Sequence, residues 1–255
     1  MRKTALITGA SSGLGREFAK QLAEQNYNLV VVARRENLLK DLARKLSHVK
    51  VNIYAVDLTA ENAVENLIKY LSNEKIYIHL LINNAGFGDY ARFDQADISK
   101  LQNMIDLNIK VLTDLMYYAS HQMIRRQSGY ILNVASTAAF QPGPMMATYF
   151  ATKHYVLALS EAVAHEWKNH GVKVSALCPG PTKTEFFDHA DMNNSSMMKS
   201  IKLPSAAEVS KFGLESMFKE KPVAVHGFLN KLLIFIGRFA PRKVLTAMTA
   251  KALEK

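Results

Sequence analysis

Short runs of almost uninterrupted apolar residues, separated by longer amphipathic segments, constrain the fold of this 255-residue chain more than any other feature. The clearest run is 29–33, which reads Leu-Val-Val-Val-Ala. A strand without polar residues at alternate positions is buried on both faces, as in a parallel sheet that helices cover on both sides. The runs that predict strands are 3–8, 28–33, 49–56, 78–83, 130–135, 172–178 and a shorter one at 222–226.

The segments between these runs have helical spacing, and we expect helices near 13–25, 36–46, 60–73, 97–126, 147–169 and 205–219. The last begins with a capping box from Ser205 to Glu208, directly after Pro204. Strands that are each followed by a helical segment predict an α/β fold: a doubly wound, Rossmann-like parallel sheet of about seven strands. We expect one Rossmann-like domain over 1–226, with a basic, amphipathic helical extension over 227–255 packed on it.

The composition excludes several classes of site. The single cysteine, Cys178, lies in an apolar run and permits neither a disulfide nor a cysteine metal site within one chain. The eight histidines have no ligand spacing, so no metal is expected. Met1-Arg2-Lys3 leads directly into the first strand, and no apolar run reaches the roughly 18 residues of a membrane span. A cytoplasmic location is therefore expected.

The net charge of +10 is concentrated at the C-terminal end, where eight basic and two acidic residues follow position 218. Such a segment is either a solvated face or a surface that attracts an anionic lipid, cofactor or carrier. No motif for nucleic-acid binding accompanies it, and no nucleic-acid partner is expected.

A glycine-rich turn follows the first strand and opens the first helix. Gly9, Gly13 and Gly15 have the spacing G-x-x-x-G-x-G, which differs from the common G-x-G-x-x-G fingerprint. Glycines let the backbone turn tightly and let phosphate oxygens approach its amides. The N-terminus of the helix adds free N–H groups, and Ser11 and Ser12 add hydroxyls. The turn therefore predicts a binding site for a dinucleotide pyrophosphate.

The end of the second strand predicts which dinucleotide binds. Sites that prefer NAD place an acidic residue there for the ribose 2′-hydroxyl. This chain has Arg34 and Arg35 instead, and a guanidinium can bind a phosphate through two hydrogen bonds. We therefore expect NADP(H) as the cofactor.

Tyr149 and Lys153 lie four residues apart in a predicted helix and share one face of it. A lysine beside a phenol favours the phenolate, which predicts a Tyr149 pKa below its ordinary value of about 10 and a proton donor near neutral pH. A chain of this composition contains about one such pair by chance, so the context carries the prediction. Ser136 precedes Tyr149 by thirteen residues, at the end of a strand.

These motifs, in this order, resemble the short-chain dehydrogenase/reductase family in its single-domain, NADP-preferring form. The resemblance covers residues 3–220. It is carried by the turn at 8–15, Asp57-Leu58 after the third strand, Asn83-Asn84-Ala85-Gly86 after the fourth, Asn108, the set Ser136, Tyr149 and Lys153, and Pro179-Gly180-Pro181-Thr182-Lys183-Thr184 after the sixth.

The resemblance implies a role for each catalytic residue. Tyr149 would donate a proton to a substrate carbonyl, and Ser136 would hydrogen-bond the same oxygen. Lys153 would lower the pKa of Tyr149 and bind the nicotinamide ribose, and Asn108 would hold the water that replenishes the proton.

The resemblance also implies contacts along the whole cofactor, from Asp57 and Leu58 at the adenine to Thr182 at the carboxamide. The full set expected at NADP(H) is Gly9, Ser11, Ser12, Gly13, Leu14, Gly15, Arg34, Arg35, Asp57, Leu58, Asn84, Ala85, Gly86, Tyr149, Lys153, Pro179, Gly180, Thr182 and Thr184. A homodimer is expected, with a tetramer left open.

Together these features predict an NADP(H)-dependent oxidoreductase that reduces a small-molecule ketone or aldehyde, or oxidises the alcohol. An apolar substrate is expected because the segment 184–204 contains Phe186, Phe187 and three methionines, which offer adaptable apolar contacts or simply pack on the domain. One alternative is a catalytically silent NADP(H)-binding regulatory or interaction protein. Another is an epimerase or dehydratase of the extended branch, which the short length and the glycine spacing disfavour.

The C-terminal extension contains two apolar stripes, separated by Pro241. The first has Phe228, Leu229, Leu232, Leu233, Ile236 and Phe239 at helical spacing, and the second has Val244, Leu245, Met248 and Leu253. Two interpretations remain open. The stripes belong to helices that cover the substrate cleft or a dimer surface, or they form a peripheral membrane contact with cationic flanks, too short to span a bilayer.

Overall fold

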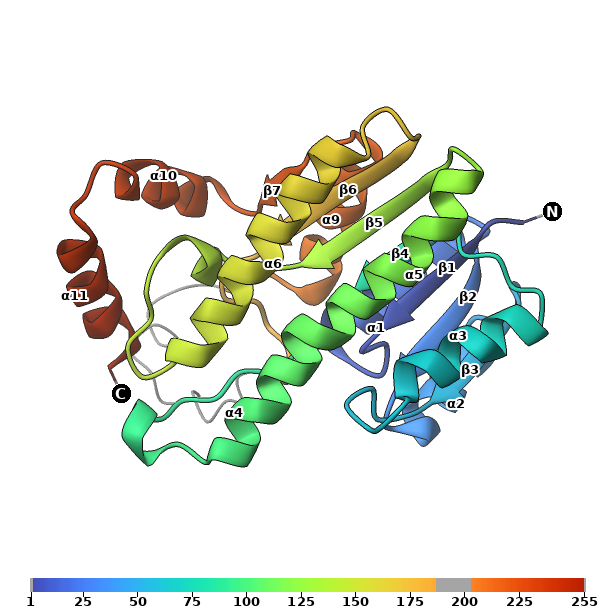
Figure 1. Cartoon of the computed structure of the whole chain (residues 1–255), viewed down its shortest axis with the longest axis horizontal. Helices are drawn as coiled ribbons and strands as arrows, with labels where there is room; N and C mark the ends of the chain where they lie inside the picture. The colour runs from blue at the N-terminus through green and yellow to red at the C-terminus, as the bar shows by residue number, and fades with distance from the viewer. Residues whose placement is uncertain (1, 187–202, 255) are drawn as a thin grey trace.

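A computed structural model of the chain describes residues 2–186 and 203–254. At its centre is a parallel sheet with the strand order β3-β2-β1-β4-β5-β6-β7 (Figure 1). The strands are β1 (Thr4–Thr8), β2 (Asn28–Ala33), β3 (Val51–Ala55), β4 (Leu80–Asn83), β5 (Gly129–Val134), β6 (Val172–Cys178) and β7 (Val223–Val225). The predicted α/β, doubly wound sheet of about seven strands is thus confirmed.

Helices connect the strands and lie on both faces of the sheet. They are α1 (Gly13–Glu24), α2 (Glu36–Lys45), α3 (Ala63–Asn73), α4 (Ile98–Ile105), α5 (Leu112–Arg125), α6 (Ala147–Glu166) and α9 (Ala206–Phe218), followed by α10 (Phe228–Gly237) and α11 (Arg242–Leu253). Short 3-10 helices occur at η1 (Phe93–Gln95) and η3 (Thr137–Phe140). The predicted cap of α9 is present, since the Ser205 hydroxyl accepts a hydrogen bond from the Glu208 amide at 3.2 Å.

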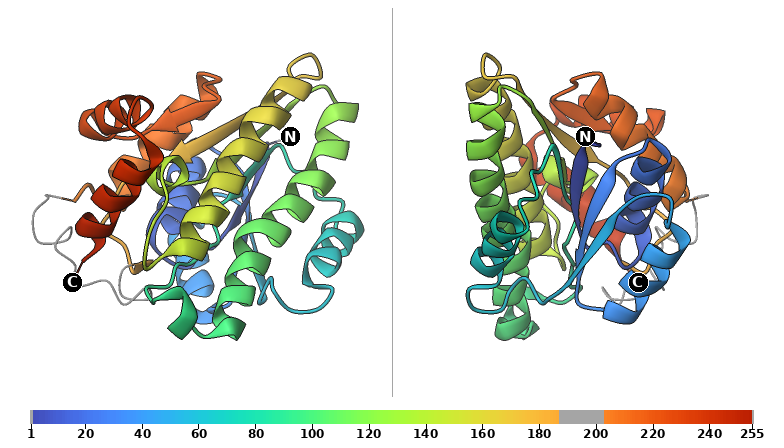
Figure 2. Two further views of the ribbon diagram at one scale, coloured as in Figure 1. Left: turned by 60° about the vertical axis from the view of Figure 1, so that its left-hand side comes forward. Right: turned by 90° about the vertical axis from the view of Figure 1, so that its right-hand side faces the viewer.

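The uninterrupted apolar strands have a simple packing explanation, because alternate side chains of each strand enter two different cores. On β2, Val30 and Val32 pack with α3, α5 and α6, whereas Leu29 and Val31 pack with α1, α2 and α9. The right-hand view of Figure 2 shows the sheet between these two helical layers. A strand buried in this way contributes apolar area to both cores, which is why it lacks polar alternation.

The predicted helix over 97–126 is one helical rod with an irregular middle. α4 and α5 are joined by a π-helical turn, η2 (Asp106–Val111), that contains Asn108. A π turn inserts an extra residue into the helix and often occurs at functional sites. It changes the direction in which the Asn108 side chain points relative to a regular helix.

The sheet positions a crevice at the carboxyl ends of its strands. β1 has β2 on one side and β4 on the other, so the chain order reverses there. Loops that follow β1 and β4 diverge to opposite faces at such a point, and ligands of doubly wound sheets bind between them.

The C-terminal extension forms two helices at one end of the molecule, and α11 returns toward the carboxyl ends of the strands (Figure 1). Of the helices in 2–186 and 203–254, none combines the length and the apolar character that a membrane span needs. Phe187, Met192, Met197 and Met198 lie outside the described residues.

Candidate active site

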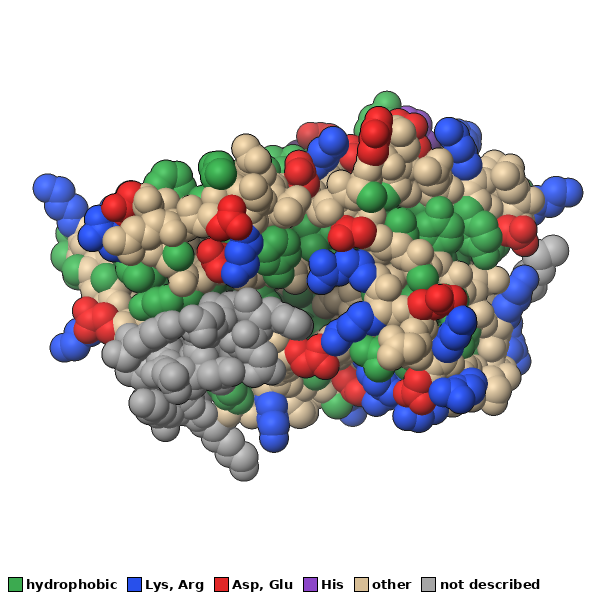
Figure 3. All heavy atoms as spheres, turned by 90° about the horizontal axis from the view of Figure 1, so that it is seen from below, with side chains coloured by type: hydrophobic (Ala, Val, Ile, Leu, Met, Phe, Trp, Pro, Cys, Tyr) green, Lys and Arg blue, Asp and Glu red, His purple; other side chains and the backbone are tan. Residues whose placement is uncertain are grey.

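A cleft of about 630 Å³ opens at the carboxyl ends of the strands. Figure 3 shows this hollow from below the view of Figure 1, with hydrophobic side chains on its floor and charged side chains at its rim. Most of the predicted site residues line it: Gly9, Ser11, Ser12, Gly13, Leu14, Arg34, Arg35, Asp57, Leu58, Asn84, Ala85, Gly86, Ser136, Tyr149, Lys153, Pro179, Gly180, Thr182 and Thr184. Gly15 and Asn108 do not line the cleft but lie behind its wall.

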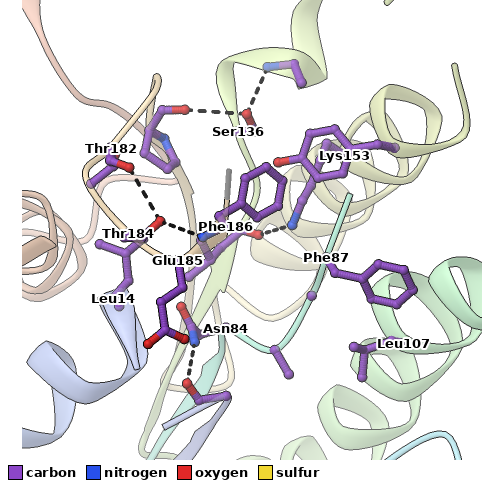
Figure 4. Close-up of a pocket in the computed structure, with 18 of the residues that line it drawn as sticks. Leu14, Asn84, Phe87, Leu107, Ser136, Lys153, Thr182, Thr184, Glu185 and Phe186 are labelled. Carbon is purple, nitrogen blue, oxygen red and sulfur yellow. Dashed lines mark hydrogen bonds between the residues drawn. The ribbon is translucent and has the colours of Figure 1, made fainter. Parts of the chain in front are cut away.

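The glycine-rich turn is held against the loop after β4. The Asn84 side-chain amide donates to the carbonyl oxygens of Thr8 at 2.9 Å and Gly9 at 3.3 Å (Figure 4). In return, the Thr8 hydroxyl accepts the backbone N–H groups of Asn84 and Ala85, both at 3.0 Å. Asn84 therefore stabilises the cofactor end of the cleft, because its hydrogen bonds fix the turn that follows β1.

Gly15 lies behind this turn, and the close approach explains why a glycine is required. An added Cβ would lie 2.6 Å from Asn84 Nδ2 and closer still to the Gly9 carbonyl oxygen. No side chain fits at that distance without a shift of the turn. Gly15 thus supports the shape of the cofactor end of the cleft without lining the cleft itself.

A Gly15→Ala substitution should therefore reduce the free energy of unfolding by about 1–3 kcal/mol and weaken cofactor binding at the same time. Chemical denaturation and cofactor titration measure the two effects. Gly237→Ala in α10 is the matched control, because its Cβ would have an ordinary 3.4 Å contact with Leu245 and alanine favours a helix. Unchanged stability and binding in the Gly15→Ala protein would contradict this account of the turn.

The N-terminus of α1 points its free backbone groups at the cleft. Ser12 is the N-cap, but its side chain makes no capping hydrogen bond. Its hydroxyl instead accepts from Arg35 Nη2 at 2.8 Å, and Ser11 Oγ accepts from the same guanidinium at 3.2 Å. Free N–H groups at a positive helix end, beside hydroxyls and a guanidinium, fit a pyrophosphate.

The two arginines after β2 have different surroundings. Arg35 is tied to the turn and also pairs with Glu185 at 2.8 Å. Arg34 is 77% exposed and has a 3.8 Å contact with the Asp57 carboxylate. Burial raises the pKa of Asp57, but two hydrogen bonds from Thr59 and the charge of Arg34 outweigh it, so the net pKa lies below its ordinary value. Arg34 is therefore available at the rim for a further anionic group.

Ser136, Tyr149 and Lys153 meet at the other end of the cleft. Ser136 follows β5 and caps η3, where its hydroxyl accepts the Ala138 amide at 3.1 Å. Tyr149 and Lys153 are both buried on one face of α6, with Lys153 Nζ 5.7 Å from the centre of the tyrosine ring. Lys153 Nζ donates to the Val134 carbonyl at the end of β5 at 2.8 Å, which anchors α6 to the sheet.

The prediction that Lys153 lowers the pKa of Tyr149 is wrong for this structure. Burial raises the pKa of Tyr149 to about 12, and only the Ser136 hydroxyl acts in the opposite direction. Burial also lowers the pKa of Lys153 to about 8. The physical reason is that both groups lose water, while the ammonium group is directed to the Val134 carbonyl. Tyr149 is thus fully protonated at neutral pH, as a proton donor must be.

Asn108 acts through the backbone of the loop after β4. Its side-chain amide donates to the Phe87 carbonyl at 3.0 Å and to Thr152 Oγ1 at 3.1 Å, and its Oδ1 accepts the Phe87 amide at 3.2 Å. Thr152 in turn donates to the Tyr149 carbonyl at 2.7 Å. A Cβ on Gly86 would lie 2.9 Å from Asn108 Oδ1, so only glycine permits this approach. The predicted role of Asn108 in holding a water molecule stays a prediction.

The segment after β6 closes the cleft from the side. Thr182 Oγ1 donates to the Gly180 carbonyl at 3.0 Å. Thr184 Oγ1 donates to the Thr182 carbonyl at 3.4 Å and accepts the Phe186 amide at 3.3 Å (Figure 4). The Phe186 ring lies 5.3 Å from that of Tyr149, centre to centre. Hydrogen bonds within the segment therefore support an aromatic ring that lies beside Tyr149, tilted by 49° to its ring.

The end of the cleft around Tyr149 is apolar, and apart from Phe186 and Leu253 its residues were not singled out in the sequence. They come from the loop after β4, from η2, η3, the loop before α6, α6, the segment after β6 and α11: Phe87, Leu107, Ala138, Met146, Phe150, Phe186, Ala252 and Leu253. Leu253 is buried in one cluster with Tyr149 and Phe150. They belong to no catalytic or cofactor motif. Two signals for them were present in the sequence, the apolar segment that contains Phe186 and the open interpretation that the C-terminal stripes, which include Leu253, cover the cleft.

Comparisons with known proteins identify the family of the chain. The family model described as short chain dehydrogenase matches residues 3–195. The chain belongs to the short-chain dehydrogenase family. A solved short-chain dehydrogenase from Sphingobium yanoikuyae in complex with NADPH is 30% identical, with a TM-score of 0.83, and the match covers 93% of this chain and 94% of that one.

Two further members of the family show the range of its substrates. The solved bulky-bulky ketone specific alcohol dehydrogenase from Comamonas testosteroni is 27% identical, with a TM-score of 0.79 over 93% of this chain and 92% of its own. The diacetyl reductase [(S)-acetoin forming] from Staphylococcus epidermidis is 29% identical over 211 residues, which are 82% of each chain. This short-chain dehydrogenase is therefore an NAD(P)-dependent oxidoreductase that acts on CH–OH or C=O groups.

Proposed function

We propose that this short-chain dehydrogenase is an NADP(H)-dependent reductase of apolar ketones or aldehydes, with Tyr149 as the proton donor. One observation carries the proposal. A buried, protonated Tyr149 lies with Ser136 and Lys153 at the apolar end of a cleft whose other end has the helix N-terminus and two arginines. The dinucleotide fits along the cleft, and the carbonyl compound fits beside Tyr149.

The chemistry of the reduction follows from these groups. NADPH, when bound, supplies a hydride to the carbonyl carbon. Tyr149 and Ser136 donate hydrogen bonds to the carbonyl oxygen, and the Tyr149 proton moves to that oxygen as its negative charge develops. Lys153 has a pKa of about 8, so most Lys153 side chains are charged at pH 7. Their positive charge stabilises the tyrosinate that remains. A proton from solvent then restores Tyr149.

The preference for NADP(H) over NAD(H) rests on Arg34. Its guanidinium lies at the rim of the cleft, with most of its surface exposed and only a 3.8 Å contact to Asp57. In NAD-preferring sites an acidic residue at the end of this strand binds the ribose 2′-hydroxyl. The chain has arginines, and no acidic residue, at positions 34 and 35 directly after β2. The NADPH in the related dehydrogenase from Sphingobium yanoikuyae supports the same preference.

An Arg34→Asp substitution should weaken NADPH binding by about ten- to a hundredfold, because one charge-assisted phosphate contact is lost. NADH binding should stay within a fewfold of wild type or improve, since aspartate accepts the 2′-hydroxyl. Fluorescence titration of both cofactors measures this. Arg44→Asp is the control, because Arg44 lies on the exposed side of α2 and does not line the cleft. Tighter binding of NADH than NADPH by the unmodified protein would contradict the proposal.

Consumption of NADPH with a panel of carbonyl compounds tests the substrate class. The panel contains small polar ketones, bulky apolar ketones, aldehydes and 3-oxoacyl thioesters, each at equal concentration. We expect turnover to be highest for the apolar members, since Phe87, Phe150 and Leu253 line the space beside Tyr149. Tight NADPH binding without turnover of any member would favour the alternative of a catalytically silent NADP(H)-binding protein.

The homodimer stays a prediction, as do the tetramer and the cytoplasmic location. The surface that suits a homodimer best is the outer side of α5 and α6, which lie side by side in Figures 1 and 2. Tyr117 on α5 is 60% exposed, and Tyr155 on α6 hydrogen-bonds Thr113 at 2.9 Å at the same surface. Exposed aromatic side chains of this kind are common at subunit interfaces.

A further inference from the structure

The apolar stripe of α10 faces solvent. Its helical spacing suggests a buried face, yet α10 contains no buried residue. Apart from the less exposed Ile234, the exposed fractions of its large apolar side chains range from 41% at Leu232 to 81% at Phe228. We call this surface, with its continuation past Pro241, the C-terminal apolar face: Phe228, Leu229, Leu232, Leu233, Phe235, Ile236, Phe239, Val244 and Met248.

The opposite side of α10 is narrow and partly polar. Asn230, Ile234 and Gly237 are its less exposed positions. Asn230 donates to the His226 carbonyl at 2.8 Å, and Lys231 Nζ lies 5.7 Å from the centre of the Phe212 ring. The helix is thus attached to the domain through this narrow side, where Ile234 is its only large apolar side chain. An apolar surface of this extent marks an interaction site.

Cations flank the C-terminal apolar face. The segment 227–254 contains five basic residues and one acidic residue, Glu254. The basic residues are Lys231, Arg238, Arg242, Lys243 and Lys251. Within the described residues, no ion pair neutralises any of these five. In Figure 3, hydrophobic side chains and Lys or Arg side chains share this end of the molecule.

This charge decides between two occupants of the face. A second copy bound through a two-fold axis would place the same surface against itself, so each copy's five cations would face a segment with five further cations and a single acidic residue, Glu254. An anionic bilayer offers apolar chains for the exposed side chains and negative headgroups for the cations. We propose that α10 and α11 dock this protein on the surface of an anionic membrane, with the C-terminal apolar face in the headgroup region.

α11 contributes both to the C-terminal apolar face and to the wall of the cleft. Thr249, Ala252 and Leu253 on its inner side line the cleft, while Val244 and Met248 belong to the exposed face. One helix therefore separates the membrane contact from the apolar end of the cleft. The docked protein would hold that end beside the bilayer, which, given the proposed function, suits carbonyl compounds that dissolve in lipid.

Sedimentation with vesicles tests the docking on the full chain. Vesicles of phosphatidylcholine with one quarter phosphatidylglycerol are compared with pure phosphatidylcholine, at low and high salt. We expect binding to the anionic vesicles at low salt, at least tenfold weaker binding at high salt, and at least tenfold weaker binding to the neutral vesicles. Because cofactor binding uses other residues, titration with NADPH verifies the fold and the cofactor site of every protein used.

Two matched double variants locate the contact. Phe228→Asp with Ile236→Asp alters the face, and Phe93→Asp with Ile98→Asp makes the same chemical change at exposed residues of η1 and α4. The first variant should bind anionic vesicles at least tenfold less than wild type, and the second within about threefold of it. Absence of wild-type binding at low salt, or equal binding by both variants, would overturn the proposal. A wild-type dimer that only the first variant dissociates, without vesicle binding, would assign the face to a second copy instead.

Discussion

A Tyr149→Phe protein should reduce its best carbonyl substrate at least about a hundred times more slowly than wild type, because it loses its general acid. The substitution removes only a hydroxyl, and the ring keeps its contacts with Phe150, Phe186 and Lys153. The dissociation constant of NADPH should therefore change by less than about threefold, since no hydrogen bond that shapes the cofactor end is lost. Steady-state kinetics and cofactor titration measure the two quantities.

Tyr155→Phe is the matched control for this experiment. Tyr155 lies on the same helix, but its hydroxyl bonds to Thr113 at the surface of α5 and does not line the cleft. Its substitution should leave turnover within about twofold of wild type. A Tyr149→Phe protein that keeps more than a tenth of wild-type turnover would rule out Tyr149 as the proton donor.

A Lys153→Met protein should be more stable than wild type and almost inactive. Burial lowers the Lys153 pKa from 10.5 to about 8, so a charged lysine at pH 7 costs the folded state about 3 kcal/mol. Methionine removes that cost but also the 2.8 Å hydrogen bond to the Val134 carbonyl, worth about 1 kcal/mol. We expect a net gain of about 2 kcal/mol in the free energy of unfolding at pH 7.

The pH dependence of this gain has a definite sign. The folded pKa of Lys153 lies below the unfolded one, so between pH 8 and 10.5 the unfolded chain binds more protons and wild-type stability rises with pH. The advantage of the methionine variant should thus be greatest at pH 7 and nearly gone at pH 10. Chemical denaturation at both pH values measures it. An advantage that is equal at pH 7 and pH 10 would contradict a buried ammonium group as its cause.

The strands were predictable from the sequence because each is buried on two faces. Runs such as 29–33 contain no polar alternation, and the structure places their alternate residues in separate cores. The helix over 97–126 was predicted without its irregular middle. The π turn around Asn108 leaves no compositional trace, because its residues also suit a regular helix.

The cofactor end of the cleft was more predictable than the substrate end. Gly9, Gly13 and Asn84 belong to motifs whose spacing reflects a local turn, so their positions follow from short stretches of sequence. Phe87 and Leu253 come from segments 166 residues apart, and only the fold brings them to one wall. No local sequence pattern predicts that two such distant segments lie on the same wall of the cleft.

Spacing reports a common face of a helix but not the surroundings of that face, and this limit appears at two places in the chain. The spacing of Tyr149 and Lys153 placed them on one side of α6, but burial and the Val134 carbonyl set their pKa values. Likewise, the spacing of Phe228 and Leu232 left open whether the stripe is packed or faces a membrane, and the structure leaves both side chains exposed. Burial depends on neighbours from distant segments of the chain.

The path of the hydride and the proton is the central claim, and isotope transfer tests it most directly. The protein is incubated with NADPH that carries deuterium at the transferable position and with the best ketone of the panel, and the alcohol is analysed by mass spectrometry and NMR. We expect one deuterium per alcohol, at the carbinol carbon, and one alcohol per NADPH consumed, with the same labelling but at least about a hundredfold slower formation in the Tyr149→Phe protein. Unlabelled alcohol, or NADPH consumed without alcohol, would contradict hydride transfer to the carbonyl carbon at this site.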